Sequence, residues 1–224
     1  MNWTQYIDGY CERVDPGFWA EPVNALTNAA FLIAAYVMWR RVRGQGTPLA
    51  MLLVLILAAI GVGSFLFHTF ATVWASVADV TPIGLFILTY LYIANREFAG
   101  WPVWVSLLGV VGFLPYAAGL TAILSDIPFF QISNFYWTVP ILIYVYAFFL
   151  RKSAPETARG MVIGATILVA SITIRSLDIP VCDGFPLGVH FLWHVLNGIM
   201  LGWMIEVYRR HRVSGGLAGG PDQR

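Results

Sequence analysis

Three histidines stand at spacings from which they could bind one metal ion. His190 and His194 lie four residues apart in the stretch HFLWH, and His68 closes the stretch SFLFH. Residues four positions apart share one face of a helix, so the imidazoles of HFLWH can point at a common place. Three neutral imidazoles beside an open position are a known arrangement for catalytic zinc, which lowers the pKa of a bound water to about 7. The spacing therefore predicts a hydrolytic zinc centre.

Hydrolysis also requires a group that takes a proton from the water. HFLWH lacks the glutamate of the HExxH pattern, so the base must come from elsewhere in the chain. Asp79, which follows His68 along the chain, is the carboxylate expected at the depth of the histidines. Ser64 lies one helical turn before His68, where its hydroxyl can orient a water or donate to a developing oxyanion. We predict Asp79 and Ser64 as catalytic residues.

The elements that must position these side chains are membrane-spanning helices. Apolar residues make up 58% of the 224 residues and charged residues only 11%, whereas a soluble domain carries about 25% charge. Seven apolar stretches have lengths near the ~20 residues that cross a bilayer, namely 23–39, 50–69, 78–94, 102–121, 135–150, 160–176 and 187–208. The sequence thus predicts an all-α membrane protein, a bundle of seven transmembrane helices.

The basic residues give this bundle an orientation. Among the 13 lysines and arginines, only Arg13 and Arg175 fall on one side of the predicted membrane. Cytoplasmic loops carry an excess of basic residues, so the N-terminus is expected outside and the C-terminus in the cytoplasm. The three histidines and Asp79 then lie at one depth near the outer surface. The residues of the basic side are Arg40, Arg41, Arg43, Arg96, Arg151, Lys152, Arg159, Arg209, Arg210, Arg212 and Arg224.

The stretches SFLFH and HFLWH, together with Asp79 between them, resemble the alkaline ceramidases. These are membrane hydrolases of a superfamily that includes adiponectin-receptor-like proteins, and the resemblance covers the whole chain. In that family the same elements, in this order and at roughly this spacing, bind zinc and carry the chemistry. The resemblance implies that His68, His190 and His194 hold zinc and that Asp79 and Ser64 act beside them.

The N-terminal stretch IDGYCERVDPGFWAEPVNALTN, residues 7–28, strengthens this resemblance. The ceramidases begin with a D-W-C-E segment, which is followed by an A-E pair and an N-x-x-x-N stretch. Each of these features has a counterpart in the present chain, although DGYCE replaces DWCE and the gap to the A-E pair is shorter. The counterparts are Cys11-Glu12, Ala20-Glu21 and Asn24 with Asn28.

In the family this N-terminal segment binds calcium through carboxylate, amide and backbone oxygens, which are ligands that suit Ca²⁺. The resemblance therefore implies a calcium site with Asp8, Glu12, Asp15 and Glu21 as candidate ligands. The family's asparagine after the Cys-Glu pair has no clear match, and Asp15 could substitute for it. The alternative is an acidic segment that is only solvated.

Cys11 and Cys182 are the only two cysteines of the chain. Both lie on the predicted outer side, in a compartment that permits disulfides. A bridge would tie the N-terminal segment to the loop before the last span, and two unpaired thiols are the alternative. The family resemblance implies that Cys11 pairs with the cysteine before the last span, which is Cys182.

The predicted function is that of a zinc-dependent intramembrane lipid amidase, which hydrolyses the N-acyl amide of ceramide-type lipids to a fatty acid and a sphingoid base. Asp79 would take the water proton and later protonate the leaving amine, while Ser64 steadies the oxyanion. Two alternatives stay open: a zinc hydrolase of another acyl lipid, and a seven-helix receptor or lipid-binding protein with structural zinc. Asp79 and Ser64 argue against the receptor, because a closed structural site needs four protein ligands and no base.

Residues 1–212 are expected to form a single transmembrane hydrolase domain, whose residues 1–22 are an extracytoplasmic polar segment. Residues 213–224 are expected to form a disordered cytoplasmic tail. The expected setting is a bacterial inner membrane with the active site toward the extracytoplasmic side. The expected partners are the lipid bilayer and a ceramide-like substrate; no nucleic acid is expected, and no oligomeric state is predicted.

Overall fold

The computed structural model describes the backbone of residues 2–218 and the side chains of residues 2–213. Within these residues the chain is helical and contains no strand, which confirms the predicted all-α class. A π-helical turn, Ala94–Phe98, extends α4, and 3₁₀ turns at Gln131–Ser133 and Ile179–Val181 adjoin α6 and α7. The α-helices are α1 (Pro22–Thr27), α2 (Ala29–Val42), α3 (Pro48–Phe70), α4 (Val73–Ile93), α5 (Val103–Ser125), α6 (Asn134–Leu150), α7 (Pro155–Leu177) and α8 (His190–Ala218).

Six helical segments of residues 2–218 are long and apolar enough to cross a membrane. Their ends lie within five residues of the ends of the first six predicted spans. The last helix, α8, is not among them; it carries His190, His194, Asn197 and Glu206, whose polar groups make it less apolar than its neighbours. The six segments are Pro22–Val42, Pro48–Phe70, Val73–Phe98, Val103–Ser125, Gln131–Leu150 and Pro155–Leu177.

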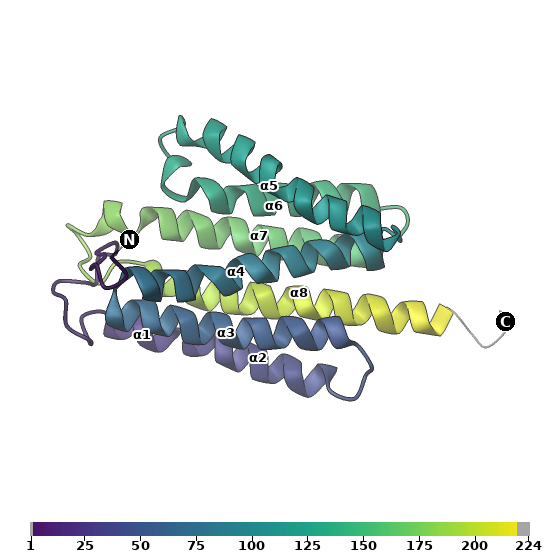
Figure 1. Ribbon diagram of the computed structural model, residues 1–224, viewed down its shortest axis with the longest axis horizontal. Coiled ribbons are helices and arrows are strands. Elements are labelled where there is room, and N and C mark those ends of the chain that lie inside the picture. Colours follow the sequence, from purple (N-terminus) through teal and green to yellow (C-terminus); the bar gives the residue numbers. More distant parts are fainter. Residues whose placement is uncertain (1, 219–224) are drawn as a thin grey trace.

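The helices run side by side along a common axis (Figure 1). Helix α3 packs against α2 and α4, α8 packs against α2 and α7, and α6 packs against α5 and α7. Apolar side chains such as Leu53, Leu57 and Ile205 are completely buried between them. Proline stands at the start of α1, α3 and α7, where its missing N–H would have no partner in any case.

The connection between α3 and α4 is shorter than the sequence suggests. Ala71 adopts the left-handed conformation with φ of +47° and ends α3, and α4 begins at Val73. The predicted start of this span, residue 78, therefore lies five residues after the start of the helix. Asp79 consequently lies in the second turn of α4 instead of at its start.

The N-terminal segment, residues 2–21, lies across the end of the bundle at which α3 ends and α8 begins (Figure 1). The backbone N–H of Ile7 donates to the carbonyl of Ala71 at 2.8 Å, and that of Val73 donates to Gln5 at 3.1 Å. At the opposite end, α8 continues past residue 213, where the tail was predicted to begin, to Ala218. Residues 219–224 of the predicted tail lie outside the described residues.

Candidate metal centre

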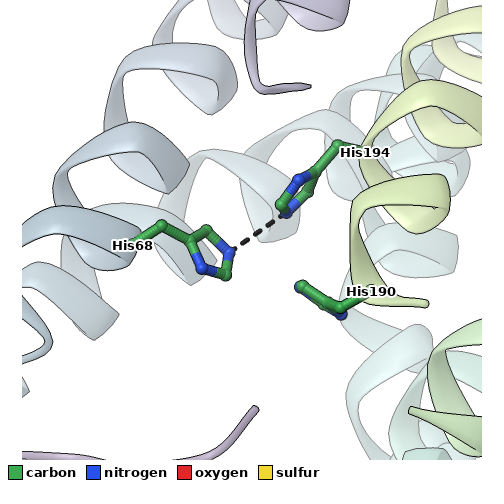
Figure 2. Close-up of side chains that lie close together, drawn as sticks. All are labelled: His68, His190 and His194. Carbon is green, nitrogen blue, oxygen red and sulfur yellow. Dashed lines mark hydrogen bonds between the residues drawn. The ribbon is translucent and has the colours of Figure 1, made fainter. Parts of the chain in front are cut away.

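The structure brings the three predicted histidines together. His68 lies in the last turn of α3, while His190 and His194 occupy the first two turns of α8 (Figure 2). One nitrogen of each ring lies within 4.8 Å of those of the other two. Each side chain is buried, with at most 2% of its surface exposed. Within the described residues this is the one cluster of three or more His, Cys, Asp or Glu side chains placed to hold a metal ion.

Hydrogen bonds at the outer ring nitrogens define the state of two imidazoles. Glu21 Oε2 lies 2.6 Å from His68 Nδ1, and a carboxylate only accepts, so Nδ1–H is the donor. The Thr27 hydroxyl donates to the Val23 carbonyl at 2.8 Å and therefore accepts from His194 Nδ1–H at 2.9 Å. In neutral rings both Nε2 atoms then carry lone pairs, which face each other at 3.1 Å (dashed line in Figure 2). A cation between these two nitrogen atoms would relieve the repulsion of their lone pairs, so the arrangement suits a pair of metal ligands.

Glu21 is held as a carboxylate behind His68. Burial alone would raise the pKa of Glu21, but its hydrogen bonds and charge interactions with His68 and Arg13 bring the pKa below its ordinary value. Arg13 Nε lies 2.5 Å from Oε1, and Asn24 Nδ2 donates to Oε2 at 3.0 Å. Metal-ligating histidines commonly donate their outer N–H to such a carboxylate, which fixes the ring orientation. Glu21 thus orients His68.

The N-terminus of α8 fixes the position of His190. Asp178 Oδ1 accepts from the backbone N–H groups of Val189 at 2.7 Å and His190 at 2.9 Å, and its Oδ2 accepts from the N–H of Cys11 at 3.0 Å. These bonds satisfy donors that a helix start leaves open. The Tyr10 ring stacks on the imidazole with ring centroids 3.7 Å apart. His190 Nδ1 is buried without a hydrogen-bond partner among the described residues.

Asp79 and Ser64 lie beside this cluster on adjoining helices. Ser64 is buried one turn before His68 on α3. Polar neighbours of the Asp79 carboxylate include Ser64, His68 and Arg175. The two helices approach closely because a side chain is missing at Gly63, where an added Cβ would lie 3.2 Å from Asp79 Cα and closer still to the preceding carbonyl. The structure therefore brings the predicted acid/base and the predicted hydroxyl to the metal-ligating end of α3.

No three of the four candidate calcium ligands form a cluster. Glu12 uses both carboxylate oxygens to accept backbone N–H groups of the first turn of α1, at 2.7 and 2.8 Å. Burial raises the pKa of Glu12, although these backbone bonds oppose the rise. Asp15 accepts the N–H of Gly17 at 2.5 Å, Asp8 is exposed, and Glu21 is engaged as described above. No shared oxygen cage forms among these carboxylates.

Cys11 and Cys182 form a disulfide, with their Cα atoms 5.4 Å apart. The bond joins the N-terminal segment to the loop between α7 and α8. It therefore fastens the segment that carries Tyr10 and Glu12 beside the start of α8, where His190 and His194 begin the helix.

An apolar cavity between the helices opens beside the histidines. It is lined by residues that include Ile60, Phe86 and Met200. Phe31 and Trp193 join it to the metal centre, because the Phe31 ring lies 6.1 Å from the His194 ring and the Trp193 ring 6.4 Å from the His190 ring. The cavity therefore offers apolar space near the polar cluster, although none of the three histidines lines it.

The sequence patterns did not predict four side chains of this site. Thr27 and Asp178 hold metal-site groups by hydrogen bonds, and Tyr10 stacks on His190. Burial raises the pKa of Tyr10 to about 12, which keeps its hydroxyl neutral. Arg175 lies over the rings of Tyr136 and Trp193, at 5.1 and 5.6 Å. Only Arg175 could have been noticed in the sequence, because a charged residue within an apolar span is unusual. The contacts of Thr27, Asp178 and Tyr10 depend on how the loops fold against the bundle.

Fold and site together define a multi-pass helical membrane protein with a buried three-histidine centre that could bind a metal ion, consistent with zinc. The chain belongs to the ceramidase family, because the model of that family matches residues 9–214, nearly the whole chain. This membership supports a ceramide hydrolase, an enzyme that acts on amide bonds of a lipid substrate in a bilayer. No curated protein matches the chain.

Proposed function

We propose that this protein is a zinc-dependent intramembrane ceramidase, which hydrolyses the N-acyl amide of ceramide-type lipids. One observation carries the zinc proposal: two buried Nε2 lone pairs face each other at 3.1 Å beside a third buried imidazole. Nitrogen donors of this kind and number suit zinc with an open position. His68, His190 and His194 would hold the ion, which when bound polarises a carbonyl and lowers the pKa of water to about 7.

The residues around the ion move the proton. Asp79 accepts the proton of the attacking water and delivers it to the amide nitrogen as the C–N bond breaks. The Ser64 hydroxyl donates a hydrogen bond toward the carbonyl oxygen as negative charge develops there. The products are a fatty acid, which gains the water oxygen, and a sphingoid base, which gains the proton. The adjacency of both side chains to His68 supports these roles.

The apolar cavity supports a substrate with long hydrocarbon chains. It extends from Phe31 and Trp193, beside the histidines, to Met204 in the middle of α8. An acyl chain in this space would keep its amide at the polar end, next to the imidazoles. Tyr136 and Trp193 line this cavity, whereas Trp203 donates to the Gly160 carbonyl elsewhere.

Residues 1–212 act as one domain in this proposal, and α8 is its seventh span. The packing of α8 against α2 and α7, along the common axis, supports a spanning role. The N-terminus and the metal centre face the extracytoplasmic side of a bacterial inner membrane, with the C-terminus in the cytoplasm. The uneven distribution of basic residues supports this orientation.

Lipid turnover by the purified protein tests the proposal. The protein should release fatty acid from ceramide and contain zinc. His194→Ala should lose both metal and turnover, whereas Asp79→Asn should keep the metal and lose about 100- to 10,000-fold in rate. His211→Ala is the matched control, since this fourth histidine bonds Thr157 and the Glu97 carbonyl, outside the cluster.

The outcomes separate the alternatives. If the protein hydrolyses a different acyl lipid and leaves ceramide intact, it is a zinc hydrolase with another substrate. Bound zinc without turnover of any acyl lipid would instead favour a receptor or lipid-binding protein with structural zinc.

A further inference from the structure

The N-terminal acidic segment already contains a cation, the guanidinium of Arg13. The side chain of Arg13 is completely buried, and that of Glu21 is 3% exposed. Arg13 Nε donates to Glu21 Oε1 at 2.5 Å, and Nη1 donates to the carbonyls of Asp15 at 3.1 Å and Gly17 at 3.3 Å. Nη2 donates to the His68 carbonyl at 2.9 Å. Four oxygens of the kind that a hard metal ion would take are thus turned toward one guanidinium.

The remaining oxygens of the segment leave no cage for calcium. Both oxygens of Glu12 accept backbone N–H groups of α1, and those of Glu21 accept from Arg13, His68 and Asn24. Asn24 and Asn28 each retain one buried amide oxygen without a partner among the described residues. These two buried neutral oxygens fall short of the about six to eight oxygen ligands that Ca²⁺ takes. The other two candidate carboxylates, Asp8 and Asp15, are exposed and join no cluster of three with Glu12 or Glu21. The calcium ion implied by the family resemblance therefore does not fit this chain.

We propose that Arg13 is the resident cation of this segment and positions the metal ligand His68, so that the centre needs no calcium. The inference rests on the proposed metal site. Arg13 reaches His68 by two routes: through Glu21, whose other oxygen accepts from His68 Nδ1 at 2.6 Å, and directly at the His68 carbonyl. It thereby holds the ring and the backbone of the same residue. Arg13 is a positioning residue, because it acts through Glu21 and touches no reacting atom.

The fork shape of the guanidinium matters as much as its charge. Its three nitrogens serve the N-terminal loop, the residue before α1 and the end of α3 at once. A lysine ammonium is a single point of charge and cannot span these acceptors in the same geometry. Lysine at this position should therefore restore charge balance beside Glu21 but only part of the positioning.

Two measurements test the proposal on the full-length protein in detergent. The first is thermal unfolding of the wild type in excess EGTA and in millimolar calcium, for which we expect the same midpoint. The second is zinc affinity, measured by competition with a chromogenic chelator. Arg13→Met should lower the affinity by about 10-fold, as the loss of outer partners of metal ligands does, and Arg13→Lys should fall between. Arg159→Met is the control, because Arg159 forms only an exposed pair with Glu156.

A calcium-dependent rise in the wild-type midpoint would overturn the proposal, and so would wild-type zinc affinity in Arg13→Met. If Arg13→Met does not accumulate, Arg13→Lys and Glu21→Gln carry the affinity test, with reduced affinity expected in both. The calcium measurement needs neither zinc nor a variant. A protein that passes both measurements but hydrolyses no lipid would refute the proposed enzyme and leave the role of Arg13 intact.

Discussion

The Thr27 hydroxyl decides which nitrogen of His194 is available to an ion. Its one hydrogen goes to a carbonyl of its own helix, at 2.8 Å from Val23, so its oxygen can only accept from the imidazole. The Nδ1–H of His194 is thereby fixed, and Nε2 is left to face His68. Threonine at this position acts on the metal centre through the tautomer of the ring.

Replacing Thr27 by valine should weaken the metal site while keeping the side-chain shape. Without the acceptor, His194 can protonate either nitrogen and its ring is no longer oriented, so we expect zinc affinity to fall by about 10-fold. Thr27→Ser should retain the wild-type affinity, because the hydroxyl is preserved. Chelator competition measures the effect, and Thr166→Val, at an exposed hydroxyl near Tyr144, is the control. Equal affinities of Thr27→Val and Thr27→Ser would contradict the tautomer argument.

Among the elements, the close packing of α3 on α4 sets the distance between His68 and Asp79. Gly63 allows this packing, since an added Cβ would meet the backbone of α4 at Ala78 and Asp79. Gly63 lies one residue before Ser64, so a shift of either helix changes the relation between hydroxyl and carboxylate. The relative position of Ser64 and Asp79 is therefore a property of the helix pair.

Gly63→Ala should lower both stability and turnover. Overpacking at a tight contact costs about 1–3 kcal/mol, and separation of the helices should reduce kcat while zinc stays bound at its three histidines. Gly84→Ala, within α4, is the control: no atom lies within 4 Å of an added Cβ, and a helix gains about 0.5–1 kcal/mol from the change. Thermal unfolding and lipid turnover measure the two effects. Full activity in a destabilised Gly63→Ala protein would show that the helix spacing does not set the chemistry.

Local patterns in the chain predicted the helices and the convergence of the three histidines. Long apolar stretches predict membrane spans from composition alone. The i,i+4 spacing of His190 and His194 places both rings on one face of α8. The start of α4 was misplaced because Ala71 makes a left-handed turn that a sequence of ordinary residues does not reveal. The roles of Arg13 and Glu21 depend on how the N-terminal segment folds over the bundle, so no local pattern could assign them.

For the molecule as a whole, the disulfide keeps that segment over the metal centre. It joins residues 171 positions apart in the chain, and Cys11 also donates to the carboxylate that caps α8. Cys182→Ser should therefore cost about 2–4 kcal/mol of stability, as disulfides typically contribute, and should also lower zinc affinity. Unfolding and chelator competition with and without a thiol reductant check this. The double variant Cys11→Ser/Cys182→Ser should no longer respond to reductant, and a wild type unaffected by reductant would refute the expectation.

The orientation of the whole molecule can be predicted from two unrelated features. Basic residues gather at the end of the bundle away from the histidines, where Arg41 pairs with Glu206 at 3.5 Å and Arg212 with Glu97 at 2.6 Å. The disulfide lies at the histidine end. Basic ends stay in the cytoplasm, and disulfides persist in oxidising compartments, so both features predict that the metal centre faces the outside.

We therefore expect a fusion after residue 212 to report the cytoplasm. Green fluorescent protein placed there should fluoresce, and alkaline phosphatase placed there should be inactive, because the phosphatase needs disulfides that form only outside. Phosphatase fused in the loop between α7 and α8, near Asp183, should be active. The opposite pattern would place Cys11 and Cys182 in a reducing compartment and the arginine-rich end outside, against both physical arguments at once. Such a result would also require the lipid substrate to reach the histidines from the cytoplasmic leaflet.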